Sequence, residues 1–500
     1  MTQSVGARFC LVLILLAFSA LVFHGLGSEI LWNDEGLSFF IAKAGVREAL
    51  VRVARDVHGP LYYAMLAAPL KFGHDLFTLR VLSAVAAITS LAFVYLSARA
   101  LLGQGLGLLA TTLYAIQPNT VEWAQHARPY SLQSMFVAIS FWGFVQIILA
   151  PRENDRLLLH GIAAAWRQRN LLAAKTEIAW LTYTLGGGLA MLVQHPGGFY
   201  VFGCNVVIAA IFLRSPHACR RLLVYWIIAQ LVLIAIWAIW LPEFVIQIRE
   251  HLTPSSIEAR HGNYLVGSVW PEFIALLGAT HLWKLQPLPM LVNLALVAVG
   301  LVAAIRQRSS MVWIHLLIAS PIALGMLGYI LVHPIFGYVI SKMYWITIPY
   351  TILIVYGIGA LGWRPAQVLS LLVVAILNLR ALQNYYSDIT PARPDMIAEF
   401  ITHNGTQDDG MIFDPGGSYR FSVTYYLPPD WQNLPGLDPL IAGEHVISSP
   451  TQAALQRRNW VIVEVGSEPA VPFAFLEQTS TLAMEHRFGQ VIVRRYDRRG

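Results

Sequence analysis

The sequence FCLVLILLAFSALVFHGL at residues 9–26, followed by Leu31-Trp32-Asn33-Asp34-Glu35-Gly36, decides the class of this protein. The first stretch is long and apolar enough to cross a bilayer, which takes about 20 apolar residues in a helix. The second stretch sets two adjacent carboxylates directly after it, at the membrane surface. Because a charge held there is costly, Asp34 and Glu35 are candidate functional residues.

The composition of the chain extends this interpretation to most of its length. Of the 500 residues, 56% are hydrophobic and only 12% are charged, whereas soluble domains carry roughly 25% charged residues. The chain is therefore predicted to be a polytopic membrane protein. Residues 9–26 resemble a cleaved signal peptide in having Arg8 before them, but no small-x-small cleavage site follows. We favour an uncleaved first helix.

Eleven segments are predicted to span the membrane, of which those at 104–118 and 197–213 are short. The full set is 9–27, 80–102, 104–118, 129–149, 177–194, 197–213, 222–241, 287–305, 311–332, 344–362 and 366–383. With the N-terminus in the cytoplasm, the basic loop 150–176 and the arginines near 214–221 and 306–308 all fall inside, as the positive-inside rule requires. The predicted topology is therefore N-in and C-out.

The carboxylates of the first stretch belong to one long external loop, residues 28–79. Its segment Leu61–Phe72 is too short to span the membrane, and a span there would place the basic 150–176 loop outside. Segments of about 36–54 and 60–73 are instead predicted to be interfacial amphipathic helices. A second long external loop, residues 242–286, is expected to cover a site.

A change in charge marks a domain boundary near residue 384. Residues 1–383 carry a net charge of +11 and residues 384–500 a net charge of −5. We therefore predict a transmembrane domain, 1–383, and a small extracytoplasmic α/β domain, 384–500. Within the second domain the pattern predicts a helix at 395–403, strands at 410–414 and 460–465, and an edge strand at 491–496. Residues 423–427 fit either a helix or a strand.

Several polar clusters on the outer side are candidate parts of a site. Asp34 and Glu35 could also be acids that favour a helix N-terminus, and Asp56-Val57-His58-Gly59-Pro60-Leu61-Tyr62-Tyr63 could be an aromatic belt with a turn. A carboxylate beside Asp56 would have a raised pKa, which suits a general base. Asp34, Glu35, Asp56 and His58 could instead bind a metal, although their spacing is not diagnostic, so a divalent metal stays open.

External cations complete the set of candidates. The dense polar run 117–130 includes His126, Arg128 and Tyr130, and Arg80 and Lys342 flank other spans on the same side. Any one of these cations could simply extend to the lipid headgroups. Together they favour an anion site, for which a lipid phosphate is the natural ligand.

Four motifs in order resemble glycosyltransferase family 39, which are membrane transferases of the GT-C class. They are Asp34-Glu35 after the first span, Asp-x-His-x-Pro-Leu-Tyr-Tyr at 56–63, Leu79-Arg80-Val81-Leu82-Ser83-Ala84, and Gln125-His126-Ala127-Arg128-Pro129-Tyr130-Ser131-Leu132. The resemblance covers residues 30–150 well, with a weaker echo at 333–349. The family includes protein O-mannosyltransferases and bacterial aminoarabinose transferases.

The resemblance implies inverting transfer of a sugar from a polyprenyl-phosphate carrier. Asp34 would be the catalytic base with Glu35 as its companion, Asp56 and His58 would line the cavity with Tyr62, His126 and Tyr130 nearby, and Arg80 or Arg128 would bind the carrier phosphate. Two residues depart from the family pattern: Gly59 stands where a proline is usual, and Lys342 stands where an arginine is frequent. The second departure matters more, because a lysine is a point charge and not a planar fork.

The sequence thus predicts a membrane glycosyltransferase that acts on a lipid-linked sugar and on an extracytoplasmic protein, lipid or glycan. Because cations can stabilise the leaving phosphate, a metal cofactor is not strictly required, although a divalent metal stays open, and no feature indicates nucleic-acid binding. A transporter or flippase of a lipid-linked saccharide is the alternative, and it would require charges near span centres. A non-catalytic scaffold is the third. The compact loops indicate a bacterial inner membrane.

Overall fold

The computed structural model describes residues 5–150, 171–216, 220–251, 276–278, 287–331, 342–387, 393–413, 419–431, 457–465 and 476–499. Most of the predicted loops 242–286 and 150–176 lies outside these residues. The chain divides into two compact units. The first, here the helical unit, comprises residues 1–26, 57–62 and 80–387. The second, here the loop–sheet unit, comprises residues 27–56, 63–79 and 388–500.

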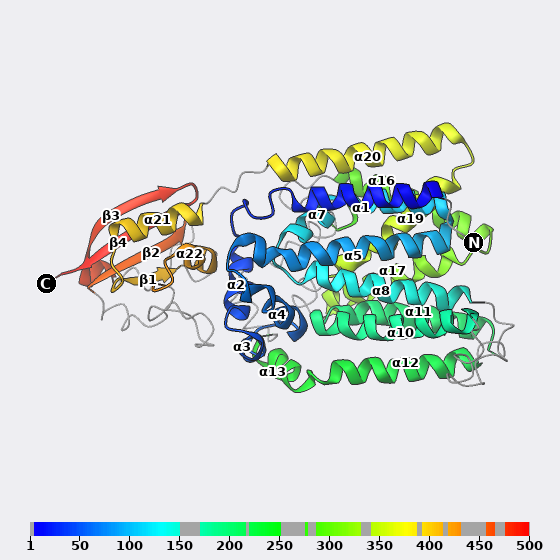
Figure 1. Ribbon diagram of the computed structural model, residues 1–500, viewed down its shortest axis with the longest axis horizontal. Helices are drawn as coiled ribbons and strands as arrows, with labels where there is room; N and C mark the ends of the chain where they lie inside the picture. Colours follow the sequence, from blue (N-terminus) through cyan, green and yellow to red (C-terminus); the bar gives the residue numbers. More distant parts are fainter. Residues whose placement is uncertain are drawn as a thin grey trace. The chain divides into compact units, whose positions relative to one another are not determined.

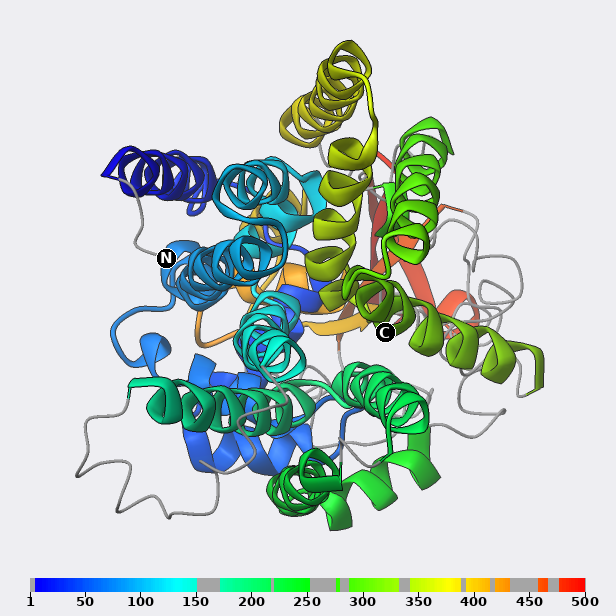
Figure 2. The ribbon, with the colours of Figure 1, turned by 90° about the vertical axis from the view of Figure 1, so that its right-hand side faces the viewer.

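The helical unit is a bundle of long helices that run in roughly the same direction (Figure 1) and are seen nearly end-on in Figure 2. Every predicted span contains a helix among the described residues. These helices are α1 (Val5–Phe23), α5 (Leu76–Leu102), α6 (Gln104–Ala115), α8 (Tyr130–Leu149), α10 (Leu171–Val193), α11 (Gly197–Arg214), α12 (Arg220–Ala238), α16 (Pro287–Arg306), α17 (Met311–Leu331), α19 (Thr347–Ala360) and α20 (Arg364–Ser387). Shorter elements at their ends are α7 (Pro118–Gln125), α13 (Leu241–His251) and η6 (Tyr344–Ile346).

The surface of the bundle is that of a membrane protein. Leu16, Leu231, Leu291 and Leu369, on four different helices, are each more than half exposed. Exposed apolar residues over such an area are compatible with lipid and not with water. Among the described residues, six helices satisfy the length and hydropathy of a span on their own, or seven with the bent pair α12–α13. The chain is therefore an integral, multi-pass membrane protein, as predicted, while its orientation stays a prediction.

Of the two short predicted spans, one is a short helix, whereas the other, α11, has 18 residues and is long enough to span. Helix α6 has 12 residues and so rises only about 18 Å, less than the roughly 30 Å of bilayer hydrocarbon. It packs between longer helices, α1 and α19. Its buried small residues, including Ala110 and Thr111, allow that close packing.

The external loop forms short helices and no span, as predicted. Its elements are α2 (Asn33–Ala42), α3 (Val46–Val53), α4 (Pro60–Leu66) and η1 (Pro69–Lys71). The segment expected as one helix over 36–54 is two, because Gly45 between them has φ +97°, which breaks the helical path. Arg52 joins the two helices by donating a 2.7 Å hydrogen bond to the carbonyl of Phe40.

The C-terminal part of the loop–sheet unit contains a four-stranded sheet of order β1-β2-β4-β3. The strands are β1 (Gly410–Phe413), β2 (Arg458–Glu464), β3 (Ser480–Phe488) and β4 (Val491–Arg498), and β1 pairs with β2 in parallel. Helices α21 (Pro394–Asn404) and α22 (Arg420–Tyr426) supply Ile397, Ile401 and Val423 to a core shared with Trp460. The predicted helix and strands are confirmed in type, and the ambiguous segment 423–427 is mostly helical.

One strand prediction is wrong in its position. The segment 491–496 was expected at an edge, but β4 lies between β2 and β3 and pairs with both. The strand at that edge of the described sheet is β3, which the sequence pattern does not reveal because most of its residues are exposed on both faces. A register shift between Leu482 and Met484 further breaks the alternation that marks a strand. The domain boundary near 384 stays a prediction.

Candidate active site

The two carboxylates of the opening stretch lie in the first turn of α2 and differ in environment. Glu35 is fully buried, and its Oε2 accepts a 3.1 Å hydrogen bond from the backbone N–H of Trp32. The backbone N–H of Glu35 donates in turn to the carbonyl of Trp32, at 3.0 Å. Glu35 is thus one half of a helix-capping arrangement. Its proposed role beside the catalytic base stays a prediction, but the structure gives it a structural one.

Asp34 is the more accessible member of the pair, being half-buried where Glu35 is sealed. Its backbone carbonyl accepts a hydrogen bond from Oγ of Ser38, so the helix is regular at this residue. A carboxylate in the first turn of a helix is stabilised by the helix dipole. Of the two acids, Asp34 is therefore the better placed to exchange a proton with a bound molecule.

Asp56 belongs to the same unit as Asp34 and Glu35. It is half-buried and follows α3, where its backbone N–H donates to the carbonyl of Val53.

No group of three or more His, Cys, Asp or Glu side chains that could hold a metal ion occurs among the described residues. The metal alternative stays a prediction.

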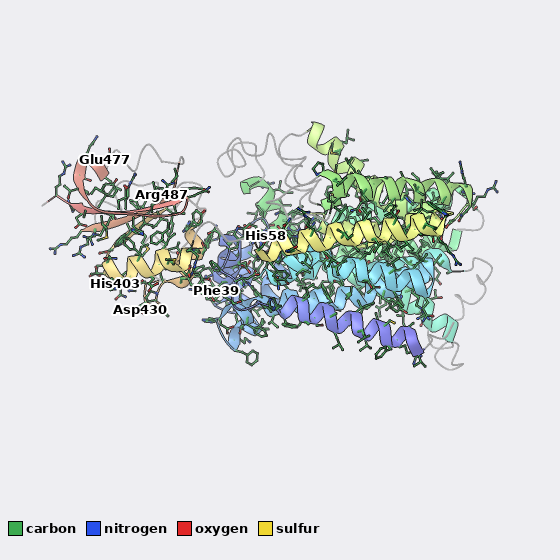
Figure 3. The ribbon with its side chains drawn as sticks, turned by 90° about the horizontal axis from the view of Figure 1, so that it is seen from above. Phe39, His58, His403, Asp430, Glu477 and Arg487 are labelled. Carbon is green, nitrogen blue, oxygen red and sulfur yellow. The ribbon has the colours of Figure 1, made fainter. Side chains whose placement is uncertain are left out.

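His58 and Arg128 are brought together in the helical unit, although 70 residues separate them. Nη2 of Arg128 lies 3.2 Å from Nε2 of His58, and both side chains are buried. Arginine has only donors, so His58 accepts through Nε2. Figure 3 shows His58 at one end of the helical bundle. The sequence predicted a role for each residue, and the structure adds that they are direct neighbours.

A second histidine, His195, completes a chain of hydrogen bonds behind His58. Gln247 donates through Nε2 to the carbonyl of His58, at 3.2 Å, and its Oε1 lies 3.1 Å from Nε2 of His195. Nδ1 of His195 lies 3.4 Å from the indole nitrogen of Trp237. Both contacts are hydrogen bonds if His195 carries its proton on Nε2, because Nε2 then donates to Gln247 and Nδ1 accepts from Trp237. Burial lowers the pKa of His195 to about 4, so the ring is neutral at pH 7.

Sequence analysis missed His195 and Gln247. A signal for the first was present, because His195 and Pro196 form the short connection between the predicted spans 177–194 and 197–213. With the N-terminus inside, that connection falls on the same side as His58. Gln247 lies on α13, in a loop that was expected only to cover a site.

Gly59 is required by close packing. A Cβ added there would lie 2.2 Å from the carbonyl oxygen of Leu192 and 2.9 Å from that of Val193. The segment that carries His58 therefore presses its backbone onto the end of α10. The departure from the family's proline at this position is explained, since a pyrrolidine ring would meet the same carbonyls.

Arg80 is fully buried on α5 and donates a 3.1 Å hydrogen bond from Nη1 to the carbonyl of Leu26, at the end of the first helical segment. Three residues along α5, Oγ of Ser83 donates to the backbone carbonyl of Arg128. Helix α5 thus fixes the backbone that carries Arg128. Tyr62, on α4, is also fully buried.

Lys342 and Tyr130 form the second polar contact of the site. Nζ of Lys342 donates to the hydroxyl of Tyr130 and lies 5.0 Å from the centroid of its ring. The ring of Tyr130 packs on Trp123 with centroids 4.1 Å apart, and the ring centroids of His126 and Trp123 lie 6.0 Å apart. The turn 128–130 thus carries one cation, Arg128, at its start and contacts a second, Lys342, through Tyr130 at its end.

The profile of the family described as dolichyl-phosphate-mannose-protein mannosyltransferase matches residues 57–170, which include His58, Arg80, Arg128 and Tyr130. The predicted resemblance to the GT-C class is confirmed. The matched region is the part of the chain that carries most of the candidate site. Comparison of the sequence with curated proteins gives no match.

Solved structures of GT-C proteins have a similar fold. The oligosaccharyltransferase of Archaeoglobus fulgidus in complex with Zn and sulfate is 12% identical, covers 93% of this chain over 69% of its own, and has a TM-score of 0.51. The same enzyme tethered to an acceptor peptide covers the whole chain with 74% of its own, at 11% identity and a TM-score of 0.50. ArnT from Cupriavidus metallidurans bound to undecaprenyl phosphate is 12% identical over 97% of both chains, with a TM-score of 0.45. At these identities the similarity shows the fold alone.

Proposed function

We propose that this protein is an inverting glycosyltransferase that moves a sugar from a polyprenyl-phosphate carrier to a hydroxyl of an extracytoplasmic acceptor. The family match supports a membrane glycosyltransferase in general terms. The donor class, the acceptor and the roles of individual residues are the content of the proposal. The acceptor is a protein, a lipid or a glycan, and the membrane is the bacterial inner membrane.

The observation that carries the proposal is the pair of cations around the turn 128–130. Arg128 is 2% exposed, and such a charge is retained in a membrane protein only where it serves a purpose. It lies in the region that matches a family named for a lipid-phosphate sugar donor. A guanidinium at one end of this turn and an ammonium bound to Tyr130 at the other end suit a phosphate, which offers several acceptor oxygens.

The reaction follows from these groups. Asp34 accepts the proton of the acceptor hydroxyl, and the oxygen attacks the anomeric carbon of the sugar. The bond from that carbon to the carrier phosphate breaks at the same time, so the configuration inverts and the polyprenyl phosphate leaves with the bonding electrons. Arg128 and Lys342 stabilise the charge that develops on the leaving phosphate. The step requires no metal, redox partner or further co-substrate.

The alternative function, transport of a lipid-linked saccharide, receives less support. It predicts ionisable residues near the centres of spans and paired broken helices. In the described part of the chain, α8, α11 and α16 carry no charge inside their termini, and one bent pair, α12–α13, is found. The polar residues gather at helix ends, where chemistry at the membrane surface would need them.

The test is an assay of turnover in proteoliposomes. Synthetic polyprenyl-phosphate monosaccharides with radiolabelled sugars are supplied together with membrane extract as the source of acceptor. We expect Asp34→Asn to lower transfer of label by about 100-fold or more, as loss of a general base does. Glu48→Gln is the matched control, because Glu48 pairs with Arg52 at an exposed position of the same unit.

Two outcomes would contradict the proposal. One is full transfer by an Asp34→Asn protein that inserts normally. The other is label that crosses the bilayer while staying on its carrier, which would identify the protein as a flippase.

A further inference from the structure

Helix α22 of the C-terminal part contacts the stretch that holds Asp34 on both sides. At one end of α22, the backbone N–H of Phe421 donates a 2.9 Å hydrogen bond to Oδ1 of Asn33, the neighbour of Asp34. At the other end, the hydroxyl of Tyr426 accepts a 2.9 Å hydrogen bond from the backbone N–H of Leu31. Residues on either side of Trp32 are therefore fixed by the two ends of one short helix.

The bond to Asn33 is a helix cap supplied from elsewhere in the chain. The residue before α22, Tyr419, makes no capping hydrogen bond with its side chain. Oδ1 of Asn33 takes that place, since it accepts from Phe421 and, at 3.4 Å, from the backbone N–H of Ser422. The first N–H groups of a helix need such an acceptor. Asn33 and α22 thus stabilise each other.

Helices α2 and α22 also pack closely against each other. A Cβ added at Gly36 would lie 2.6 Å from the backbone carbon of Phe421, so the two helices touch at their backbones. Phe39, labelled in Figure 3, packs edge-on against the ring of Tyr425, with centroids 5.0 Å apart. Tyr425 in turn donates from its hydroxyl to the carbonyl of His74, farther along the external loop.

The opposite face of α22 belongs to the core of the sheet. Val423 and Leu427 are buried in the same cluster as Trp460 of β2 and Ile397 of α21. A helix held by a packed core has few alternative positions. Whatever α22 fixes is therefore fixed relative to the sheet.

We propose that α22 positions Asp34 for catalysis, which makes the C-terminal domain part of the catalytic machinery. The inference rests on the proposed role of Asp34 as the base. Asn33, Gly36 and Tyr426 are positioning residues that act through α2. This role differs from shaping access of the acceptor, because loss of the contact would slow the chemical step itself.

The experiment compares kinetic constants of single variants of the full-length protein in the transfer assay. Asn33→Ala removes the acceptor for α22, and Tyr426→Phe removes only the hydroxyl. We expect each to lower kcat by about 10- to 100-fold, as small displacements of a catalytic group do, with the KM for the carrier-linked donor changed less than about 2-fold. Asn33→Asp keeps a capping oxygen and is expected to regain most of the kcat.

Rescue of kcat by Asn33→Asp is a result that general damage to the fold would not give, because the two variants differ only in whether position 33 offers a capping oxygen. Arg393→Gln is the control, since Arg393 forms an exposed pair with Asp395 in the same domain. We expect this variant to match the wild type.

The outcomes separate this inference from the proposed function. An active Asp34→Asn protein would overturn the proposed function itself. An inactive Asp34→Asn protein, together with wild-type kcat in Asn33→Ala and Tyr426→Phe, would overturn the positioning role alone. A raised KM for the acceptor with unchanged kcat would likewise overturn it, because it would assign α22 to acceptor access.

Discussion

Nη2 of Arg128 lies 3.2 Å from Nε2 of His58, and neither side chain is more than 6% exposed. The contact joins the turn before α8 to the start of α4, two segments that the sequence marked separately. Gln247 fixes the backbone of His58 by donating a hydrogen bond to its carbonyl. The guanidinium therefore has a fixed neighbour, and this pre-organisation is what a phosphate site needs.

Substitution of Arg128 tests the phosphate site. Arg128→Lys keeps the positive charge but loses the planar fork of donors. We expect the KM for the polyprenyl-phosphate sugar to rise about 10-fold or more, and Arg128→Ala to raise it further, in line with the loss of a hydrogen bond to a charged group. Arg364→Gln, at an exposed position at the start of α20, serves as the control. An unchanged donor KM in Arg128→Ala would show that this residue is structural.

Lys342 tests whether the frequent arginine of the family can replace the lysine found here. The contact with the hydroxyl and ring of Tyr130 can be made by either cation. We expect Lys342→Arg to keep the donor KM within about 3-fold and Lys342→Gln to raise it by about 10-fold. The pair of variants is measured in the same transfer assay. Equal loss in both would indicate that the site depends on the shape of lysine and not on its charge.

Lipids that co-purify with the protein offer a test that does not need the acceptor. By mass spectrometry, the wild type is expected to retain a polyprenyl phosphate or its glycoside, which the double variant Arg128→Ala, Lys342→Ala loses. Arg80 is left intact, because it is fully buried and binds the carbonyl of Leu26. Bulk phospholipid alone in both preparations would make the two cations headgroup anchors.

His195 predicts how stability depends on pH. Burial holds its pKa at about 4 in the folded protein, against about 6.5 in an unfolded chain. Below pH 6.5 the unfolded state takes up a proton that the folded state does not. Stability is therefore lost as the pH falls from about 6.5 to about 4, by up to roughly 3 kcal/mol.

The measurement for His195 is thermal unfolding in detergent between pH 7.5 and pH 4.5. His195→Gln keeps an amide beside Gln247 but cannot titrate, so its melting temperature is expected to fall less over this range than that of the wild type. Parallel curves for the two proteins would refute the assignment.

Addition of a single methyl group at Gly59 is expected to destabilise the protein. Gly59→Ala places a methyl group 2.2 Å from the carbonyl oxygen of Leu192, and overpacking of this kind costs about 1–3 kcal/mol. We expect a lower melting temperature and displacement of His58 from its position beside Arg128. Gly198→Ala is the matched control, because a Cβ at Gly198 meets no atom within 4 Å. A normal melting temperature for Gly59→Ala would mean that the segment 57–62 can move away from α10.

The long elements could be predicted from the sequence because each carries its own signal. An apolar run such as 9–26 can only be a span or a core helix, and basic residues order the runs across the membrane. Strand β4 was assigned correctly as a strand, but its place in the sheet depends on β3. That strand is exposed on both faces and so lacks the alternation on which such predictions rest.

The sequence identified most residues of the candidate site but not which of them contact one another. Which side chain meets Arg128 depends on how the segment 57–62 packs on α10, and local pattern contains nothing about that. Asp34 and Glu35 were predicted to have different roles, but nothing in the local pattern shows that Glu35 binds the backbone N–H of Trp32. His195 escaped notice because a lone histidine in a short turn is common and rarely functional.

The bond between Asn33 and Phe421 joins residues 388 positions apart. During synthesis at about 5–20 residues per second, the ribosome needs roughly 20 to 80 s to supply α22 after α2 has emerged. For that interval α2 lacks its backbone contact with α22 and the aromatic surface of Tyr425. The packing of the helix that bears Asp34 is consequently completed late, when α22 and the sheet have been synthesised and folded. Biogenesis of this protein thus includes a built-in delay between insertion and maturation.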